Sequence, residues 1–539
     1  MRRLFTLGLL LLLAASAFAD SSNKISPDLL KAASAPAASA SAASASADSA
    51  NGITQVQPSK NATSSVDVIV RFNQVPTSVH NAKVTTLGGL FKKQLGLVKG
   101  GLYSLPPGQL KQLANDPTVV YISPDRSLHA SMDTSVPTVG ADVAKQYGWD
   151  GKGIGIAVID SGKTDDPDLN DPVTGTSRVV YSESFLPANT AVLDGFGHGS
   201  HIQSTIAGNG ASSSGKYRGI APKAKVVSLR VFNSDGSGGT DSAVIAAIQK
   251  AIQLKSTYNI RVINLSLGRP VQESYKTDPL CQAVEAAWSA GIVVVVAAGN
   301  EGRNNSQGTN GYATIGSPAN DPYVITVGAM KTNGTVSRAD DLIASFSSKG
   351  PTPLDHLVKP DLVAPGNRIV ASLGSTATYM PSHGIVRVTG PYYELSGTSM
   401  AAPIVSGAAA LLLQKDPTLT PDQVKARLMK TATKNFPTTS TTIDPVTGAL
   451  YTSYYDIFTI GAGYLNVWAA LNNTDKGTGA ALSPTAVYDP ITKTVRVVNG
   501  TAVIWGNAVV WGDAVIWGDA VIWGDAVVWG DSILTKGEK

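Results

Sequence analysis

The largest part of the chain, residues 131–472, alternates short apolar runs with amphipathic stretches. The apolar runs have the length and β-branched content of strands that are buried on both faces. They occupy residues 154–160, 225–232, 262–268, 292–300 and 324–330. Apolar residues at helical spacing mark residues 240–255 and 278–291 between them. This alternation predicts an α/β fold, with a doubly wound, mostly parallel sheet that helices cover on both faces.

A smaller pattern precedes this block. Strand-like runs at residues 66–72, 100–105 and 119–125 alternate with helical patterns at 87–97 and 106–116. Together they predict a separate, small α+β unit over residues 66–130.

The N-terminal 65 residues lack a globular pattern. Residues 1–19 combine two arginines, an apolar run from Leu7 to Ala15 and the triplet Ala17-Phe18-Ala19, which together predict a secretory signal peptide. The apolar run is too short to span a bilayer by itself, so we expect no transmembrane anchor after signal removal. Residues 32–50 are almost wholly Ala and Ser, and we interpret residues 20–65 as a disordered linker. We therefore expect a secreted protein, with a periplasmic or cell-surface location as the alternative.

The C-terminal segment, residues 473–539, contains an internal repeat. A W-G-D/N-A-V-I/V unit places a tryptophan at every sixth position, at Trp505, Trp511, Trp517, Trp523 and Trp529. Because six is an even period, each unit would present the same face in a strand. We predict a small β-rich appendage that packs against itself or the larger block, with surface attachment or partner binding as the alternative.

Composition removes several classes of function. The chain has 539 residues, 15% of them charged, and a formal net charge of +4 without any charge run, so we expect no nucleic-acid partner. The single cysteine, Cys281, excludes an intrachain disulfide and a cysteine-built metal site. Its Ala-rich helical surroundings predict a buried core position.

Candidate chemistry lies where strands end, as the topology of an open α/β sheet requires. Asp160 and Asn300 each close an apolar run, His198 stands between glycines before a helical stretch, and Ser399 lies where a Gly-containing turn enters an apolar helix. Each residue alone has an ordinary alternative, as a turn former, a loop residue or a helix N-cap. In the chain order Asp, His, Ser, they match one of the known arrangements of a catalytic triad.

The motifs around these residues resemble those of the subtilases, the subtilisin-like serine proteases. AVIDSG, GHGSH, AAGNEG and GTSMAAP follow one another as that family's signature blocks do, within roughly residues 135–472. The resemblance implies that Asp160, His198 and Ser399 form the triad. It also implies that Asn300 and the backbone N–H of Ser399 form the oxyanion hole. Residues 66–130 resemble, more weakly, the family's inhibitory and chaperone-like propeptide.

The resemblance also implies a substrate-binding cleft. Its residues would be Ser237 and Gly238 in one peptide-pairing segment, Ser266, Leu267 and Gly268 in a second, and Ala298, Gly299 and Gly316 around the primary specificity pocket. A glycine at the back of that pocket suggests room for a large apolar side chain. The alternative is that these are ordinary loop glycines.

Three departures from the family pattern have structural consequences. Gln203 and Ser204 replace smaller residues after the histidine, and we expect local repacking without loss of chemistry. Lys163 and Asp166 leave the loop after Asp160 uncertain. Arg269 follows the second peptide-pairing segment, and we expect it to point to solvent, with a preference for acidic substrates as the alternative.

Other site types fit poorly. G-x-S-x-G and H-E-x-x-H are absent, and GKGIG at residues 151–155 precedes its strand, which argues against a dinucleotide site. We expect no required cofactor and no metal ligand. Structural calcium could bind near Asp165 to Asp171 or Asp340-Asp341, but neither stretch has a complete ligand pattern, and we interpret both as solvated surface.

These observations predict a secreted serine endopeptidase that hydrolyses proteins through an acyl-enzyme on Ser399. Its own propeptide would inhibit it until self-cleavage near His129 to Asp133. The alternative is a catalytically silent subtilase scaffold that binds peptides or acts at a surface.

Overall fold

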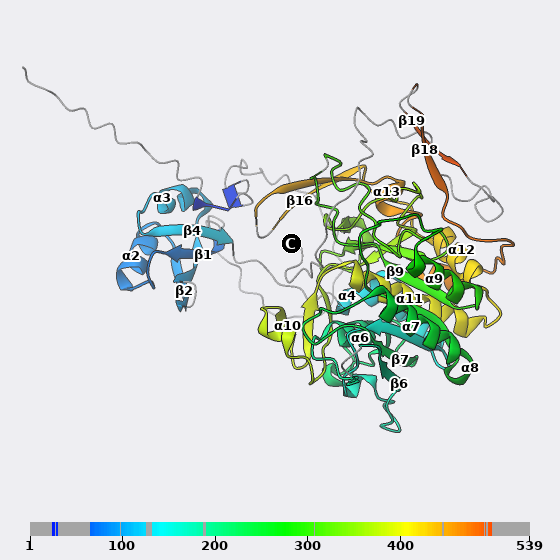
Figure 1. Cartoon of the computed structure of the whole chain (residues 1–539). Coiled ribbons are helices and arrows are strands. Elements are labelled where there is room, and N and C mark those ends of the chain that lie inside the picture. The colour runs from blue at the N-terminus through cyan, green and yellow to red at the C-terminus, as the bar shows by residue number, and fades with distance from the viewer. Residues whose placement is uncertain are drawn as a thin grey trace, which may run out of the picture. The chain divides into compact units, whose positions relative to one another are not determined.

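The computed structural model describes residues 24–26, 29–30, 65–96, 99–124, 132–186, 190–306, 308–444, 447–489, 491 and 494–498. The predicted signal peptide, most of the predicted linker and the Trp repeats lie outside the described residues. The chain divides into two compact units between Leu128 and His129 (Figure 1).

The N-terminal unit is built on a four-stranded antiparallel sheet. Its strand order is β2 (Leu90–Leu95), β3 (Gly100–Leu105), β1 (Val66–Phe72) and β4 (Val119–Pro124). The helices α2 (Ser78–Thr86) and α3 (Leu110–Ala114) complete the unit. Its core contains Val68, Val70 and Phe72, which alternate along β1 as a strand with one buried face requires.

Two predictions in this unit are wrong. The helical pattern at residues 87–97 belongs to strand β2, because Gly88, at φ +77°, ends helix α2 before it. The prediction of a disordered linker is wrong at Ile25 and Leu29, which lie in the core of the unit. There the backbone N–H of Ser26 donates to the carbonyl of Ile122 at 2.9 Å.

The C-terminal unit contains an eight-stranded sheet. Seven strands follow the order β11 (Leu342–Ile343), β10 (Ile325–Lys331), β9 (Val293–Ala297), β8 (Ile260–Leu265), β5 (Gly155–Asp160), β7 (Lys225–Arg230) and β6 (Val179–Ser184), and β12 (Leu362–Pro365) also pairs with β10. Every pairing is parallel except that of β10 with β11. The predicted α/β fold with a mostly parallel sheet is therefore confirmed.

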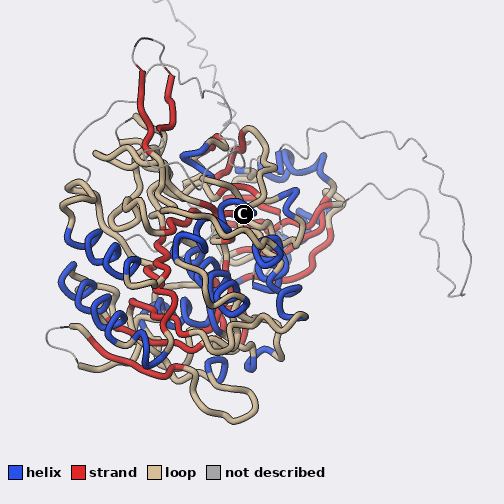
Figure 2. The backbone as a smooth tube through the Cα atoms, turned by 90° about the vertical axis from the view of Figure 1, so that its right-hand side faces the viewer, coloured by secondary structure: helices blue, strands red, loops and turns tan. Residues whose placement is uncertain are grey.

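Helices cover this sheet on both sides (Figure 2). Helices α6 (His198–Ala207) and α11 (Thr398–Lys415) pack against each other and on β5, while α7 (Asp241–Gln253) and α9 (Pro279–Ser289) form a second pair. Cys281 is buried in α9, as predicted.

Smaller elements complete the unit. A three-stranded sheet of β13 (Ile369–Ser372), β15 (Tyr392–Leu395) and β14 (Val386–Thr389) holds α10 (Tyr379–Ser382) in one of its connections. Two hairpins follow, β16 (Thr439–Ile443) with β17 (Leu450–Tyr454) and β18 (Thr485–Asp489) with β19 (Thr494–Val498). The remaining α-helices are α4 (Met132–Thr138), α5 (Ala141–Gln146), α8 (Lys255–Tyr258), α12 (Pro421–Thr431), α13 (Ile457–Ile460) and α14 (Val467–Asn472).

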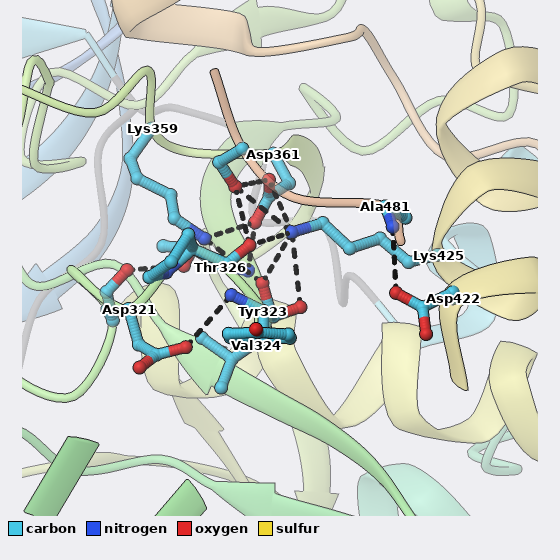
Figure 3. A network of polar contacts seen from close by, with 12 residues as sticks. Asp321, Tyr323, Val324, Thr326, Lys359, Asp361, Asp422, Lys425 and Ala481 are labelled. Atoms are coloured by element: carbon cyan, nitrogen blue, oxygen red, sulfur yellow. Dashed lines mark hydrogen bonds and ion pairs between the residues drawn. The ribbon is translucent and has the colours of Figure 1, made fainter. Parts of the chain in front are cut away.

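A buried network of charges joins the segment after α14 to the sheet (Figure 3). Lys359 donates to Asp361 at 2.7 Å, and the ammonium of Lys425 lies 3.1 Å from the same carboxylate. The hydroxyl of Ser483 donates to Asp361 at 2.6 Å and accepts from Lys425 at 3.0 Å. The described residues that follow α14 are thus packed into the larger unit through Ser483.

The charges of this network shift one another's pKa. Burial lowers the pKa of Lys425 to about 7, although Asp361 acts in the opposite direction. Burial by itself would raise the pKa of Asp361, but the positive charges of Lys359 and Lys425 outweigh it and lower that pKa. A buried ion pair of this kind persists only where additional hydrogen bonds satisfy its remaining donors and acceptors.

Candidate active site

The predicted triad residues lie at the ends of three elements of the larger unit. Asp160 is the last residue of β5, His198 is the first residue of α6, and Ser399 is the second residue of α11. Because α6 and α11 pack against each other and on β5, the fold gathers the starts of both helices near the carboxyl end of that strand.

Asp160 and His198 are in direct contact. The Nδ1 atom of His198 lies 2.8 Å and 3.0 Å from the two carboxylate oxygens of Asp160, and both residues are buried. The backbone N–H of Ser161 donates to the same carboxylate at 2.8 Å. An ionised carboxylate can only accept, so this geometry places a proton on Nδ1 and leaves Nε2 as the basic nitrogen of a neutral imidazole.

A proline determines how Ser399 is held. Pro403 lies inside α11 and has no N–H to donate to the carbonyl of Ser399, four residues earlier. That carbonyl accepts instead from the hydroxyl of Ser266 at 2.8 Å, while the hydroxyl of Ser399 donates to the carbonyl of Ser266 at 3.3 Å. This reciprocal pair ties the start of α11 to the end of β8.

Asn300 is oriented by the residue before Ser399. Its side-chain oxygen accepts from the backbone N–H of Thr398 at 2.9 Å and from the Thr398 hydroxyl at 3.1 Å. The Thr398 hydroxyl also accepts from the N–H of Gly299 at 3.1 Å. With its oxygen engaged in this way, Asn300 keeps its NH₂ group for another acceptor, beside the first N–H groups of α11, which have no acceptor within the helix.

Sequence reasoning missed Asp194, which fixes the start of α6. One carboxylate oxygen accepts from the N–H of Gly197 at 2.7 Å, and the other accepts from the N–H and the hydroxyl of Ser200, each at 2.7 Å. Asp194 is fully buried, and a negative charge at a helix N-terminus is stabilised by the helix dipole. The only signal in the sequence was an acidic residue four positions before His198.

The proposed substrate-binding residues fall into two groups. One group contains Ser266, Gly268, Ala298 and Gly316. The N–H of Gly316 donates to the carbonyl of Ala298 at 3.4 Å. The next residues along the two segments, Arg269 and Ser317, exchange backbone hydrogen bonds of 2.9 Å and 2.7 Å. Leu267 is half-buried and packs on the core. Ser237 and Gly238 belong to an exposed turn after β7, where Gly238 has φ +84°.

The close approach of two backbones requires a glycine at position 316. A Cβ atom added to Gly316 would lie 2.8 Å from the carbonyl oxygen of Arg269. The pairing of these two segments therefore explains the absence of a side chain at this position.

The expectation for Arg269 is wrong. Its guanidinium group does not point freely to solvent but donates to Asp241 at 2.9 Å and to the buried Asp278 at 2.8 Å. Asp278 also accepts from the hydroxyl of Ser317 at 2.7 Å. Arg269 thus holds the loop around Gly316 in place and is already paired with protein carboxylates.

The residues that follow His198 along α6 have structural roles. His201 is buried with its Nε2 atom 3.1 Å from the carbonyl of Ile369, and burial lowers its pKa to about 3. Gln203 donates to the carbonyl of Gly162 at 2.7 Å. The face of α6 that carries Gln203, where the family pattern has a smaller residue, is therefore packed against the loop that follows Asp160.

In the first aspartate-rich stretch, carboxylates accept hydrogen bonds from protein donors. Asp168 accepts from the N–H of Ser212 at 2.8 Å and from the hydroxyl of Tyr392, and Asp171 accepts from two N–H groups of its own turn. The interpretation as solvated surface is wrong for Asp166, Asp168 and Asp341, which are buried. Within the described residues, no group of three or more His, Cys, Asp or Glu side chains is placed to hold a metal ion.

The chain was compared with proteins that are already known. Residues 151–448 match the model of the subtilase family. The chain is 41% identical to the serine protease AprX of Bacillus subtilis, over 58% of this chain and 69% of that protein. It is 36% identical to subtilisin E of the same organism, over 70% of this chain and 88% of that protein. No helix among the described residues is long and apolar enough to cross a membrane.

Proposed function

The chain belongs to the subtilase family and is a subtilisin-type serine endopeptidase, and on this premise we propose that Ser399 is its nucleophile. The contact between Asp160 and the Nδ1 atom of His198 carries this proposal, because it leaves Nε2 as the basic nitrogen. His198 takes the proton of the Ser399 hydroxyl as the oxygen attacks the substrate carbonyl. Asp160 keeps the imidazole in the required tautomer and stabilises the imidazolium that forms.

Asn300 and the backbone N–H of Ser399 form the proposed oxyanion hole. The hydrogen bonds from Thr398 to the oxygen of Asn300 orient its NH₂ group before a substrate arrives. Donors that are already in place stabilise the tetrahedral intermediate without reorganisation. His198 then gives its proton to the leaving amine. In the second half of the reaction, His198 takes a proton from water as the water attacks the acyl-enzyme, and it returns that proton to the oxygen of Ser399. This chemistry needs no cofactor.

The substrate is a protein segment that pairs with the cleft as an additional strand. Ser237 and Gly238 would bind it on one side, and Ser266, Leu267 and Gly268 on the other. Ala298, Gly299 and Gly316 would surround the side chain next to the scissile bond, with a preference for apolar residues.

The enzyme is made as a self-inhibited precursor and secreted. Residues 1–19 direct export, and the unit formed by residues 66–130 assists folding and inhibits the enzyme until it is removed. Its arrangement as a compact unit of its own supports this role. Cleavage near His129 to Asp133 would separate the two units.

The test compares wild type with Ser399→Ala and with Ser289→Ala, which replaces an exposed serine near the end of α9. Intact mass and N-terminal sequencing are followed over time, with peptide hydrolysis and fluorophosphonate labelling of each protein. Wild type and Ser289→Ala should react, hydrolyse peptides and lose the segment up to about residue 130, whereas Ser399→Ala should do none of these. Turnover by Ser399→Ala would contradict the assignment, and a wild type that binds peptides without reacting would favour the silent scaffold.

A further inference from the structure

A short segment near the N-terminus adds to the sheet of the small unit. Ile25 forms a parallel bridge with Ile122 of β4, and the backbone N–H of Ser26 donates to the carbonyl of Ile122 at 2.9 Å. β4 is an outer strand of the sheet, and among the described residues it pairs with β1 on one side and with this segment on the other. We call residues 24–30 the strap.

The strap also supplies two side chains to the core of the unit. Ile25 is 2% exposed and Leu29 is 4% exposed, and both belong to the same buried cluster as Ile122. The N–H of Leu30 donates to the carbonyl of Ser26 at 3.0 Å, as in a helical turn. Such a turn brings side chains four positions apart to the same side, so Ile25 and Leu29 enter the core as a pair.

The small unit has little core to spare. Apart from the strap, its buried cluster comes from residues 68–122. A domain of about 60 residues buries only a modest part of its surface and is marginally stable. Truncating one buried leucine to alanine typically reduces the equilibrium constant for folding about thirtyfold or more. The folded state of this unit therefore depends strongly on whether the strap is bound.

The strap holds the strand that leads to the proposed cleavage site. β4 ends at Pro124, and self-cleavage is proposed near His129 to Asp133. After cleavage, β4 is the last strand of the released unit, between β1 and the strap. An inhibitor that binds only when it is folded is lost through its unfolded form, because the enzyme digests that form irreversibly. The strap is therefore placed where it can set the lifetime of the inhibitor.

Resting on the proposed function, we propose that the outer edge of β4 is a binding site for a short strand with two apolar side chains four positions apart, and that residues 24–30 of the same chain occupy this site and prolong inhibition after self-cleavage. While the strap is bound, the small unit stays folded and blocks the enzyme. When the strap dissociates, the edge of β4 opens, the unit unfolds more often, and the enzyme digests it.

The covalent connection of the strap determines how a free peptide can compete with it. Residues 31–64 connect the strap to β1, and their Ala- and Ser-rich composition predicts a flexible tether. Such a tether gives a local concentration on the order of millimolar. A strap weakened by substitution should therefore be replaced by a separate peptide of residues 20–31 added at several millimolar. Replacement of this kind distinguishes a binding site from an ordinary part of the core.

The first test measures hydrogen exchange in the Ser399→Ala precursor. Leu29→Ala is compared with Leu90→Ala, the same change at a position of β2 that is 64% exposed. Leu29→Ala should reduce the protection of backbone N–H groups in β4 and α3 at least about thirtyfold, and Leu90→Ala less than about threefold. The peptide of residues 20–31 should restore protection in Leu29→Ala, and the same peptide carrying Leu29→Ala should not. If Leu29→Ala does not fold, Ile25→Val should still lose protection about two- to twelvefold, and the peptide should reverse this loss.

The second test follows the active enzyme. Mass spectrometry gives the time of self-cleavage, and hydrolysis of a fluorogenic peptide gives the time at which full activity appears. The interval between these times should be several-fold shorter for Leu29→Ala than for wild type or Leu90→Ala. The peptide of residues 20–31 should lengthen it again in Leu29→Ala.

The outcomes separate the strap from the proposed function. Equal exchange in Leu29→Ala and Leu90→Ala, or no rescue by the peptide, would overturn the binding site, and an unchanged interval in Leu29→Ala would overturn its role in inhibition. Both results leave the endopeptidase assignment intact. If wild type neither cleaves itself nor hydrolyses the fluorogenic peptide, and Ser399 fails to react with a fluorophosphonate, the proposed function and the role in inhibition fall together. Hydrogen exchange then still decides whether the edge of β4 binds the strap.

Discussion

Replacing Lys425 with methionine tests whether the buried charge network stabilises the larger unit. Methionine has nearly the same length, so the substitution removes the charge and the donors with little change in packing. Lys425 is completely buried and donates to the carbonyls of Pro322 at 2.8 Å and Val324 at 3.0 Å, besides its contact with Asp361. Removing one partner of a buried ion pair lowers the free energy of unfolding by about 3–5 kcal/mol. Because Lys359 still neutralises Asp361, we expect a loss near the lower limit, about 3 kcal/mol.

The control is Lys430→Met on the next turn of the same helix. Lys430 pairs with Asp475 at the surface, where the two side chains are 44% and 55% exposed, so its loss should cost about 0–1 kcal/mol. Both substitutions are made in Ser399→Ala to prevent self-digestion, and the free energy of unfolding is measured by urea titration with circular dichroism. Ser483→Ala, which removes a single bridging hydroxyl, should cost about 1–2 kcal/mol and remains measurable if Lys425→Met does not fold. Equal losses for Lys425→Met and Lys430→Met would refute the reasoning.

Three further predictions follow, two from the candidate site and one from the buried carboxyl group of Asp341. Ser266→Ala removes the hydroxyl that holds the carbonyl of Ser399, and we expect steady-state kinetics to show a several-fold decrease in kcat with little change in KM, an effect of about 1 kcal/mol. Asp194→Ala frees three donors at the start of α6 and should cost about 2–3 kcal/mol in urea titrations, together with a lower kcat; unchanged kcat would argue against a role in positioning His198. Burial raises the pKa of Asp341 to about 7, so the folded protein keeps a proton that the unfolded chain releases above about pH 4, and stability should fall as pH rises from 4 to 7. Asp341→Asn cannot ionise and should remove this fall, with a relative gain of about 2–3 kcal/mol between pH 5 and pH 8; equal pH dependence of both proteins would contradict it.

The α/β fold could be predicted from the sequence because buried parallel strands are continuous apolar runs. Residues 154–160 and 292–300 are such runs, and both contain strands of the sheet, β5 and β9. In contrast, the edge strand β2 was mistaken for a helix. Its apolar residues are largely exposed and its pairing depends on backbone hydrogen bonds, which leave no periodic signal.

Parts of the candidate site could be anticipated for the same kind of reason, and others could not. Asp160 and Asn300 could be predicted because each closes an apolar run of the sequence. The position of the Arg269 side chain could not, because it depends on partners such as Asp278 that are brought near only by folding. Asp194 contacts backbone N–H groups, which every residue possesses, so no particular partner in the sequence reveals it. Helix α10 has only four residues, too few for an apolar period.

The buried network of Figure 3 also constrains when the larger unit can finish folding. Asp361 and Ser483 are separated by 122 positions in the chain, and their contact closes a loop of that length. Contacts of high sequence separation form slowly because the entropy of loop closure must be lost before they form. During translation, Lys359, Asp361 and Lys425 emerge well before Ser483, at rates of about 5–20 residues per second. The nascent chain therefore exposes two lysines and an aspartate at the future core to water for seconds, and the burial of these charges belongs to the last steps of folding.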